Sequence, residues 1–305
     1  MILLQQMLAL FILMIIGYAC GKKDILDSST TKKISWLVVN VANVAMILQA
    51  GLDNQNDMPK ETLLIVGGLA VAMYVMLILL AAFLPIVLRA KKENYGIYRT
   101  MLVFSNVGFM GFPLLLALAG TQAVLYAAIF QFLFSFLLYS YGITNISGRK
   151  AGESGFQWKR MINPGLIACV IAISSFFAKV DMPDFVDTVL KNLANLTAPL
   201  SMLVIGQFFT EFKLKELFTD VRLLVFTAIK MLVIPIAAML LLKQWVTDAT
   251  ILTVCLVMLS TPVASMSAML AQQYDGDYEL ASRGVALTTL LAVVTMPLVS
   301  MVVGV

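Results

Sequence analysis

Histidine is absent from the 305 residues, and cysteine occurs only three times. Without histidine the chain lacks the commonest metal ligand and proton shuttle. Cys20, Cys169 and Cys255 lie far apart in apolar stretches, without the spacing of metal ligands. The sequence also shows neither a Ser/His/Asp constellation nor a phosphate-binding glycine loop. We therefore expect no metal, no cofactor and no enzymatic activity.

Charged residues are scarce as well, at 12% of the chain, whereas 61% of the residues are hydrophobic. A soluble domain has about 25% charged and 45–50% apolar residues. This composition predicts an all-α polytopic membrane protein whose surroundings are a lipid bilayer. The net charge of +4 does not indicate nucleic-acid binding, because the basic residues lie in short loops between apolar runs.

A transmembrane helix needs about 20 mostly apolar residues, and the chain has room for ten. The first is interpreted as a span rather than a signal peptide, because no basic segment precedes it and no cleavage site follows. Pro85 is a candidate end for the third. The ten expected spans are Ile2–Cys20, Ile34–Gly51, Thr62–Leu88, Ile97–Ala119, Gln122–Ile143, Asn163–Ala178, Val189–Phe209, Val221–Leu242, Thr250–Ala271 and Leu280–Val303.

Lysine and arginine are distributed unevenly between the loops that join these spans. Of 21 such residues, sixteen fall in alternate loops, four in the opposite loops and one, Lys230, inside a span. Basic loops stay in the cytoplasm. The count predicts a multi-pass protein of the cell membrane with both termini outside.

Two of the apolar spans are interrupted by polar residues, glycine and proline at matching places. The interruptions are Phe104-Ser-Asn-Val-Gly-Phe-Met-Gly-Phe-Pro113 and Leu259-Ser-Thr-Pro-Val-Ala-Ser-Met-Ser267. Ser105 and Ser260 are 155 residues apart, as are Asn106 and Thr261. Paired breaks in two halves of a chain mark the binding site of many transporters. Unpaired backbone groups at membrane depth also require a protein-lined or water-filled surrounding.

The 155-residue offset predicts two repeats of five spans each. Residues 1–143 form the first repeat, 144–160 a cytoplasmic linker and 161–305 the second repeat. Because five is odd, the second repeat is inverted in the membrane. We expect broken spans 4 and 9 to cross near the midplane, with alternating access by one bundle moving against another.

The breaks supply most of the candidate substrate-binding residues. Glycine and proline free backbone groups, amides and hydroxyls can bind a ligand, and the N-terminus of each half-helix favours an anion. The alternatives are a kinked, tightly packed helix and hydroxyls bonded to their own helix carbonyls. The candidates are Ser105, Asn106, Gly108, Pro113, Ser260, Thr261, Pro262 and Ser265, with Asn40 and Asn43 of the second span.

Lys230 lies about ten residues into the eighth span. An ionisable residue at that depth is a functional candidate. Three roles stay open from the sequence: binding a substrate carboxylate, titrating during transport, or offsetting the negative C-termini of the half-helices.

The chain resembles the auxin efflux carrier family, which includes bacterial malonate/malate-type permeases and plant auxin exporters. The resemblance rests on Asn163-Pro164 opening span 6, on the Phe104–Pro113 segment, and on Ser260-Thr-Pro262 followed by Ala264 and Ala268. The linker at 144–160 is shorter than the long central loop of the plant proteins, which favours the microbial branch.

The resemblance implies a fold similar to those of sodium/proton antiporters and bile-acid symporters. Spans 1, 2, 6 and 7 would form a scaffold, often the interface of a homodimer, and spans 3–5 and 8–10 a mobile bundle. It further implies that Asn106, Pro113, Thr261 and Pro262 are the crossover residues.

We therefore expect a secondary or potential-driven carrier of small organic anions, such as carboxylates or indole acids. A sodium/proton antiporter would need acidic side chains at the crossing, where the chain has Asn106 and a Ser-Thr pair. A sodium-coupled symporter of the bile-acid type remains an alternative, because neutral oxygens can coordinate sodium. A non-transporting sensor or scaffold is the alternative from another class.

Overall fold

The computed structural model describes residues 2–54, 60–147, 162–180 and 182–305. Within these ranges the secondary structure is helical, apart from one isolated β-bridge between Ser105 and Val263. The expectation of an all-α protein is confirmed.

Short π-helical turns (η) interrupt several helices of the N-terminal half. Its elements are α1 (Ile2–Lys22), α2 (Ser28–Leu37), η1 (Val38–Ala42), α3 (Asn43–Asp53), α4 (Lys60–Val87), α5 (Tyr95–Val103), η3 (Val107–Gly111), α6 (Phe112–Leu137), η4 (Leu138–Gly142) and α7 (Ile143–Ser147), with the 3-10 turn η2 (Lys92–Asn94) before α5.

The C-terminal half is also built of helices interrupted by short turns, here one π-turn and two 3-10 turns among the described residues. Its elements are α9 (Pro164–Ala178), α10 (Asp184–Asn195), α11 (Thr197–Phe208), η5 (Phe209–Glu211), η6 (Leu214–Phe218), α12 (Val221–Ala228), the π-turn η7 (Ile229–Val233), α13 (Ile234–Leu242), α14 (Ala249–Ser260), α15 (Ser265–Gln273) and α16 (Tyr278–Val303).

Seven of the described helical segments are long and apolar enough to cross a membrane. One of them, Val107–Ser147, is 41 residues long, about 60 Å if straight and therefore twice the thickness of the hydrocarbon core. It is kinked at Gly120, whose φ of 71° lies in the left-handed region. Pro164–Ala178 and Ala249–Ser260 are shorter apolar helices. The kink falls between expected spans 4 and 5, so this long segment consists of two helices that meet at Gly120.

Two details differ from the sequence-based expectations. Helix α4 continues through Pro85 to Val87, because neighbouring groups in a membrane helix can accommodate a proline. The expected seventh span starts five residues earlier, since α10 begins at Asp184 and is amphipathic rather than uniformly apolar.

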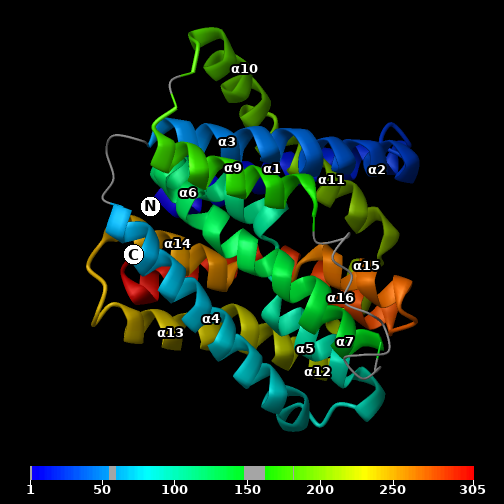
Figure 1. Cartoon of the computed structure of the whole chain (residues 1–305). Helices are drawn as coiled ribbons and strands as arrows, with labels where there is room; N and C mark the ends of the chain where they lie inside the picture. Colours follow the sequence, from blue (N-terminus) through cyan, green and yellow to red (C-terminus); the bar gives the residue numbers. More distant parts are fainter. Residues whose placement is uncertain (1, 55–59, 148–161, 181) are drawn as a thin grey trace.

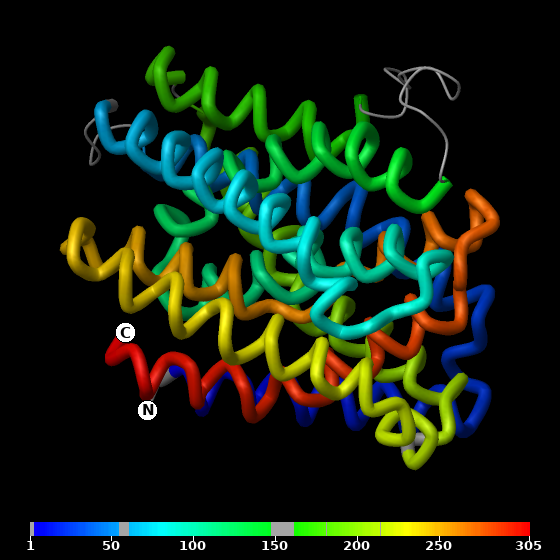
Figure 2. The backbone as a smooth tube through the Cα atoms, turned by 90° about the horizontal axis from the view of Figure 1, so that it is seen from below, coloured from blue at the N-terminus to red at the C-terminus, as the bar shows by residue number. Residues whose placement is uncertain are grey.

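The helices form two groups (Figure 1). In the first, α1 packs against α11 and α3 packs against α9 and α10. In the second, α4 packs on α5, and α16 packs against α12, α13, α14 and α15. Helix α6 contacts both groups, through α3 and α9 on one side and α14 on the other. Both chain ends lie at the same end of the molecule (Figures 1 and 2), and α1 and α16 are in contact.

Small residues bring α1 and α11 unusually close. A Cβ atom added to Gly206 would lie 2.0 Å from the backbone oxygen of Met14, and one added to Gly17 would lie 2.4 Å from that of Leu203. Close approach of helix backbones over glycine is a common way to associate helices in a membrane, where lipid supplies no hydrophobic drive between them.

The glycine contact gives a testable prediction. Gly206→Ala should lower the free energy of unfolding by about 1–3 kcal/mol, because two backbones would have to move apart. Thermal unfolding of the purified protein in detergent measures the change. Gly68→Ala is the matched control, since nothing lies within 4 Å of its added Cβ. Equal melting temperatures for the two variants would contradict the close contact.

Candidate functional site

Both predicted helix breaks are present. Helix α5 ends at Val103, and Phe104 adopts extended dihedral angles (φ −102°, ψ 111°) before η3 begins at Val107. Helix α14 ends at Ser260, and Thr261 and Ala264 are extended before α15 begins. Each break therefore leaves the C-terminus of one half-helix and the N-terminus of the next inside the protein.

The two breaks cross and are joined backbone to backbone. The Asn106 amide donates to the Pro262 carbonyl at 2.7 Å, and the Ala264 amide donates to the Phe104 carbonyl at 3.0 Å. These bonds flank Ser105 and Val263, which form the antiparallel bridge. A buried backbone group without a partner costs free energy, and here each break satisfies the other. These contacts join the two breaks that the sequence predicted.

The Lys230 side chain contacts the residues of the first break. Its side chain is 3% exposed, and its Nζ atom donates to the Leu102 carbonyl at 3.1 Å and to Ser105 Oγ at 3.0 Å. The carbonyls at the C-terminal end of α5 carry partial negative charge. Of the three roles open from the sequence, this geometry fits the offset of a half-helix C-terminus.

Thr288 of α16 supports the second break and was missed by the sequence analysis. Its hydroxyl accepts a hydrogen bond from the Val263 amide at 3.1 Å and donates to the Gly284 carbonyl at 2.7 Å. The backbone of the second break is thus attached to a third helix. A threonine inside an apolar span carries no signal in the sequence that separates this contact from a bond to its own helix.

Two asparagines bring unpartnered polar atoms to the crossing. Asn106 Oδ1 accepts from the Phe109 amide, and Asn43 Nδ2 donates to the Gly108 carbonyl at 3.1 Å. Asn106 Nδ2 and Asn43 Oδ1 are buried without a hydrogen-bond partner among the described residues. Such groups are rare in native proteins, and together they offer a ligand one donor and one acceptor.

The remaining candidates differ in their contacts. Ser260 and Thr261 are buried and donate to the Leu256 and Met258 carbonyls of their own helix. These contacts are those of the alternative interpretation, in which the hydroxyls bond the carbonyls of their own helix. Asn40 donates to the Trp36 carbonyl within its own helix.

Ser265 is half-buried at the N-terminus of α15, which no described side chain caps. The N-terminal amides of such a helix favour an anion. Pro113 is buried at the start of α6, and Ser267 Oγ is buried without a partner among the described residues.

Three π-turns surround the crossing: η1 precedes Asn43, η3 follows Asn106 and η7 contains Lys230. Such turns are rare and occur often at functional sites. Each changes the direction in which the next side chains point, which residue spacing along a regular helix does not predict.

A family model described as membrane transport protein matches residues 2–300 of the chain. No curated protein matches it.

The Thr288 contact gives a second prediction. Thr288→Val keeps the shape of the side chain but leaves the buried Val263 amide unpaired, which should cost about 1–3 kcal/mol. Thr289→Val is the control, because this buried neighbour donates only to Val285 of its own helix. Thermal unfolding, with hydrogen exchange of the Val263 amide, measures both. Faster exchange in the Thr289 variant than in the Thr288 variant would contradict the assignment.

Proposed function

The chain belongs to the membrane transport protein family, that of the auxin efflux carriers, and on this premise we propose that it carries small organic anions, carboxylates above all. The family is one of multi-pass membrane transporters and not of enzymes. The proposed binding site is the crossing of the two helix breaks.

The observation that carries the proposal is the set of unsatisfied donors at the crossing. Asn106 Nδ2 is buried and unpartnered within the described residues, and the N-terminus of α15 is open at the half-buried Ser265. Lys230 adds a positive charge behind Ser105. Donors, a helix N-terminus and a cation together favour a negatively charged ligand.

The proposed architecture has ten crossings arranged as two inverted repeats. Dividing Val107–Ser147 at Gly120, and counting α9 and the α14–α15 pair as spans, gives that number. An even number of crossings agrees with the position of both chain ends at one end of the molecule (Figure 2). We assign both ends to the outside, following the basic loops.

In this architecture, the group formed by α1, α2–α3, α9 and α10–α11 is the scaffold, where a second copy of the chain would pack. The other group moves against it during alternating access. Asn43 lies on the scaffold side and contacts the first break at Gly108, so substrate bound there would touch both groups.

The membrane potential determines in which direction transport of an anion is favourable in free energy. With the inside negative, outward movement of one negative charge gains about 2.3 kcal/mol per 100 mV. Export of an anion therefore needs no coupling ion, whereas uptake does.

Binding at the crossing is tested by a thermal-shift titration with malonate, malate and indole-3-acetate, with and without sodium. A ligand that binds only the folded protein raises Tm. Asn106→Ala should weaken the binding of the stabilising carboxylate about tenfold, the equivalent of one charge-assisted hydrogen bond. Thr261→Ala should weaken it less, because the Thr261 hydroxyl bonds its own helix.

Asn54→Ala is the matched control for Asn106→Ala, since Asn54 is buried but bonds only Ala50 of its own helix. Unchanged affinity in the Asn106 variant would remove the crossing from the binding site. Stabilisation by sodium alone would favour the sodium-coupled symporter instead.

The charge of Lys230 has its own test. Lys230→Gln should lower the affinity for malonate about tenfold and leave the affinity for uncharged malonamide unchanged, because only the first ligand interacts with the charge. Lys243→Gln is the control, as Lys243 bonds the Val303 and Gly304 carbonyls at the end of α16. Equal losses for both ligands would leave Lys230 a purely structural role.

A further inference from the structure

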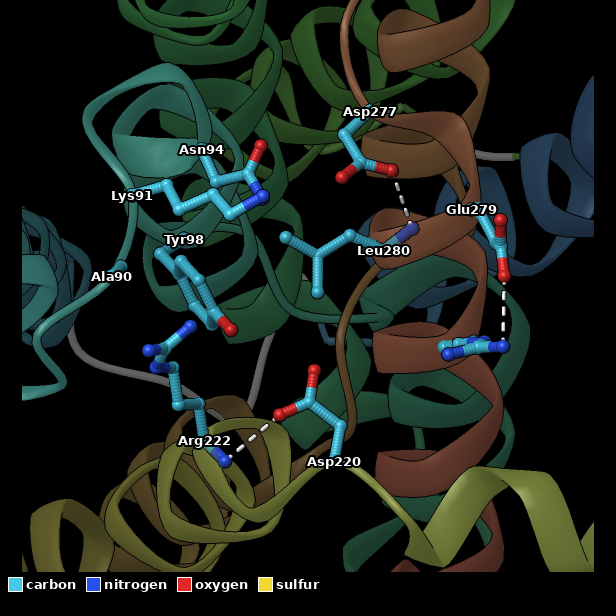
Figure 3. A pocket seen from close by; sticks show the side chains of 10 residues that line it. Ala90, Lys91, Asn94, Tyr98, Asp220, Arg222, Asp277, Glu279 and Leu280 are labelled. Carbon is cyan, nitrogen blue, oxygen red and sulfur yellow. Dashed lines mark hydrogen bonds and ion pairs between the residues drawn. The ribbon is translucent and has the colours of Figure 1, made fainter.

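A polar cavity of about 270 Å³ is lined by residues at the start of α16, the end of that helix farthest from the C-terminus of the chain. Three segments that are distant in the sequence form its walls: the approach to α5, the start of α12 and the start of α16 (Figure 3). Its lining residues are Ala90, Lys91, Asn94, Tyr98, Asp220, Arg222, Asp277, Glu279, Leu280 and Arg283.

The three carboxylates of the cavity already take part in helix caps or an ion pair. Asp220 caps α12 by accepting from the Arg222 and Leu223 amides, and Asp277 caps α16 by accepting from the Leu280 amide, in each case through Oδ1. Within the described residues, the second oxygen of each carboxylate accepts no hydrogen bond. Glu279 is paired with Arg283 at 2.8 Å and is turned away from Tyr98 (Figure 3).

Two of the cations that line the cavity, Lys91 and Arg222, form few interactions with acidic side chains. Within the described residues the Arg222 guanidinium forms no ion pair, and Lys91 has only a 3.6 Å contact with Glu93, both side chains being about 70% exposed. An exposed pair of this kind contributes little stability. The Arg222 guanidinium lies beside the Tyr98 ring, whose hydroxyl points into the cavity (Figure 3).

We propose that this cavity is a second ligand site, separate from the crossing, and that it binds a small zwitterion of the α-amino acid type. Two cations, Lys91 and Arg222, face two carboxylates, Asp220 and Asp277, so a simple anion or a simple cation would meet charge of its own sign. A zwitterion places its carboxylate against the Arg222 fork and its ammonium against the free oxygens of Asp220 and Asp277. Leu280 and the Tyr98 ring provide contact for a small apolar side chain.

The position of the cavity connects it to the crossing. Leu280 and Thr288 are eight residues apart on α16, about 12 Å, and Thr288 holds the second break. Arg222 and Lys230 are separated by the same number of residues, and Lys230 holds the first break. A ligand that ties α5, α12 and α16 together would therefore restrain the three helices that support the crossing.

The test compares three molecules of nearly equal shape: alanine, lactate, which lacks the ammonium, and alaninol, which lacks the carboxylate. The thermal-shift titration uses the Asn106→Ala protein, whose crossing should bind carboxylates weakly, and should give a saturable rise in Tm with alanine at concentrations at which lactate and alaninol give none. Arg222→Gln and Asp220→Asn should each weaken alanine binding about tenfold. The asparagine keeps the cap on α12, so the second variant removes charge without removing structure.

Matched controls separate this site from general surface charge and from the crossing. Lys92→Gln and Asp275→Asn change exposed charges next to the cavity and should leave alanine binding unchanged. Asn106→Ala should also leave it unchanged, whether or not that variant loses its carboxylate affinity. Binding of lactate or alaninol to the Asn106 variant as tight as that of alanine, loss of alanine binding in that variant, or no response to alanine would overturn the proposal.

Discussion

Two backbone hydrogen bonds join the two helix breaks, which lie 155 residues apart in the sequence, and satisfy backbone groups that the breaks leave unpaired. A helix interrupted inside a membrane exposes amides and carbonyls that lipid cannot satisfy. Here the Asn106 amide is paired with the Pro262 carbonyl and the Ala264 amide with the Phe104 carbonyl. Neither break would be tolerated alone, because each supplies the partners that the other lacks.

The side chains around the crossing follow from that constraint. Lys230 donates to the Leu102 carbonyl at the end of α5. The Thr288 hydroxyl accepts a hydrogen bond from the Val263 amide, which the two bonds between the breaks do not use. Both residues come from helices of the same group as the breaks. The crossing is therefore fixed within one group of helices, while Asn43 approaches it from the other group through Gly108. This division matches the requirements of a site that is presented alternately to two sides of a membrane.

Much of this arrangement could be predicted from the sequence, and the limits have physical causes. Polar residues, glycine and proline in an apolar run mark a helix break, so the breaks at Ser105 and Thr261 were predicted, and Lys230 was a candidate because it is an ionisable residue inside a span. The partner of Lys230 was not, because a backbone carbonyl leaves no trace in the identity of Leu102. Asn40 and Asn43 were equal candidates, but only Asn43, which follows the π-turn that contains Asn40, contacts the first break. The kink that separates spans 4 and 5 depends on a single residue with positive φ, Gly120.

The central claim is that the crossing carries an anion, and flux of a radiolabelled carboxylate from proteoliposomes tests it most directly. The vesicles would be loaded with malonate and the membrane potential set with potassium and valinomycin. We predict efflux that accelerates as the compartment containing malonate becomes more negative, and that is strongly reduced in the Asn106→Ala protein. Efflux that does not depend on the potential or on Asn106, alongside transport of a neutral or cationic solute, would contradict the account.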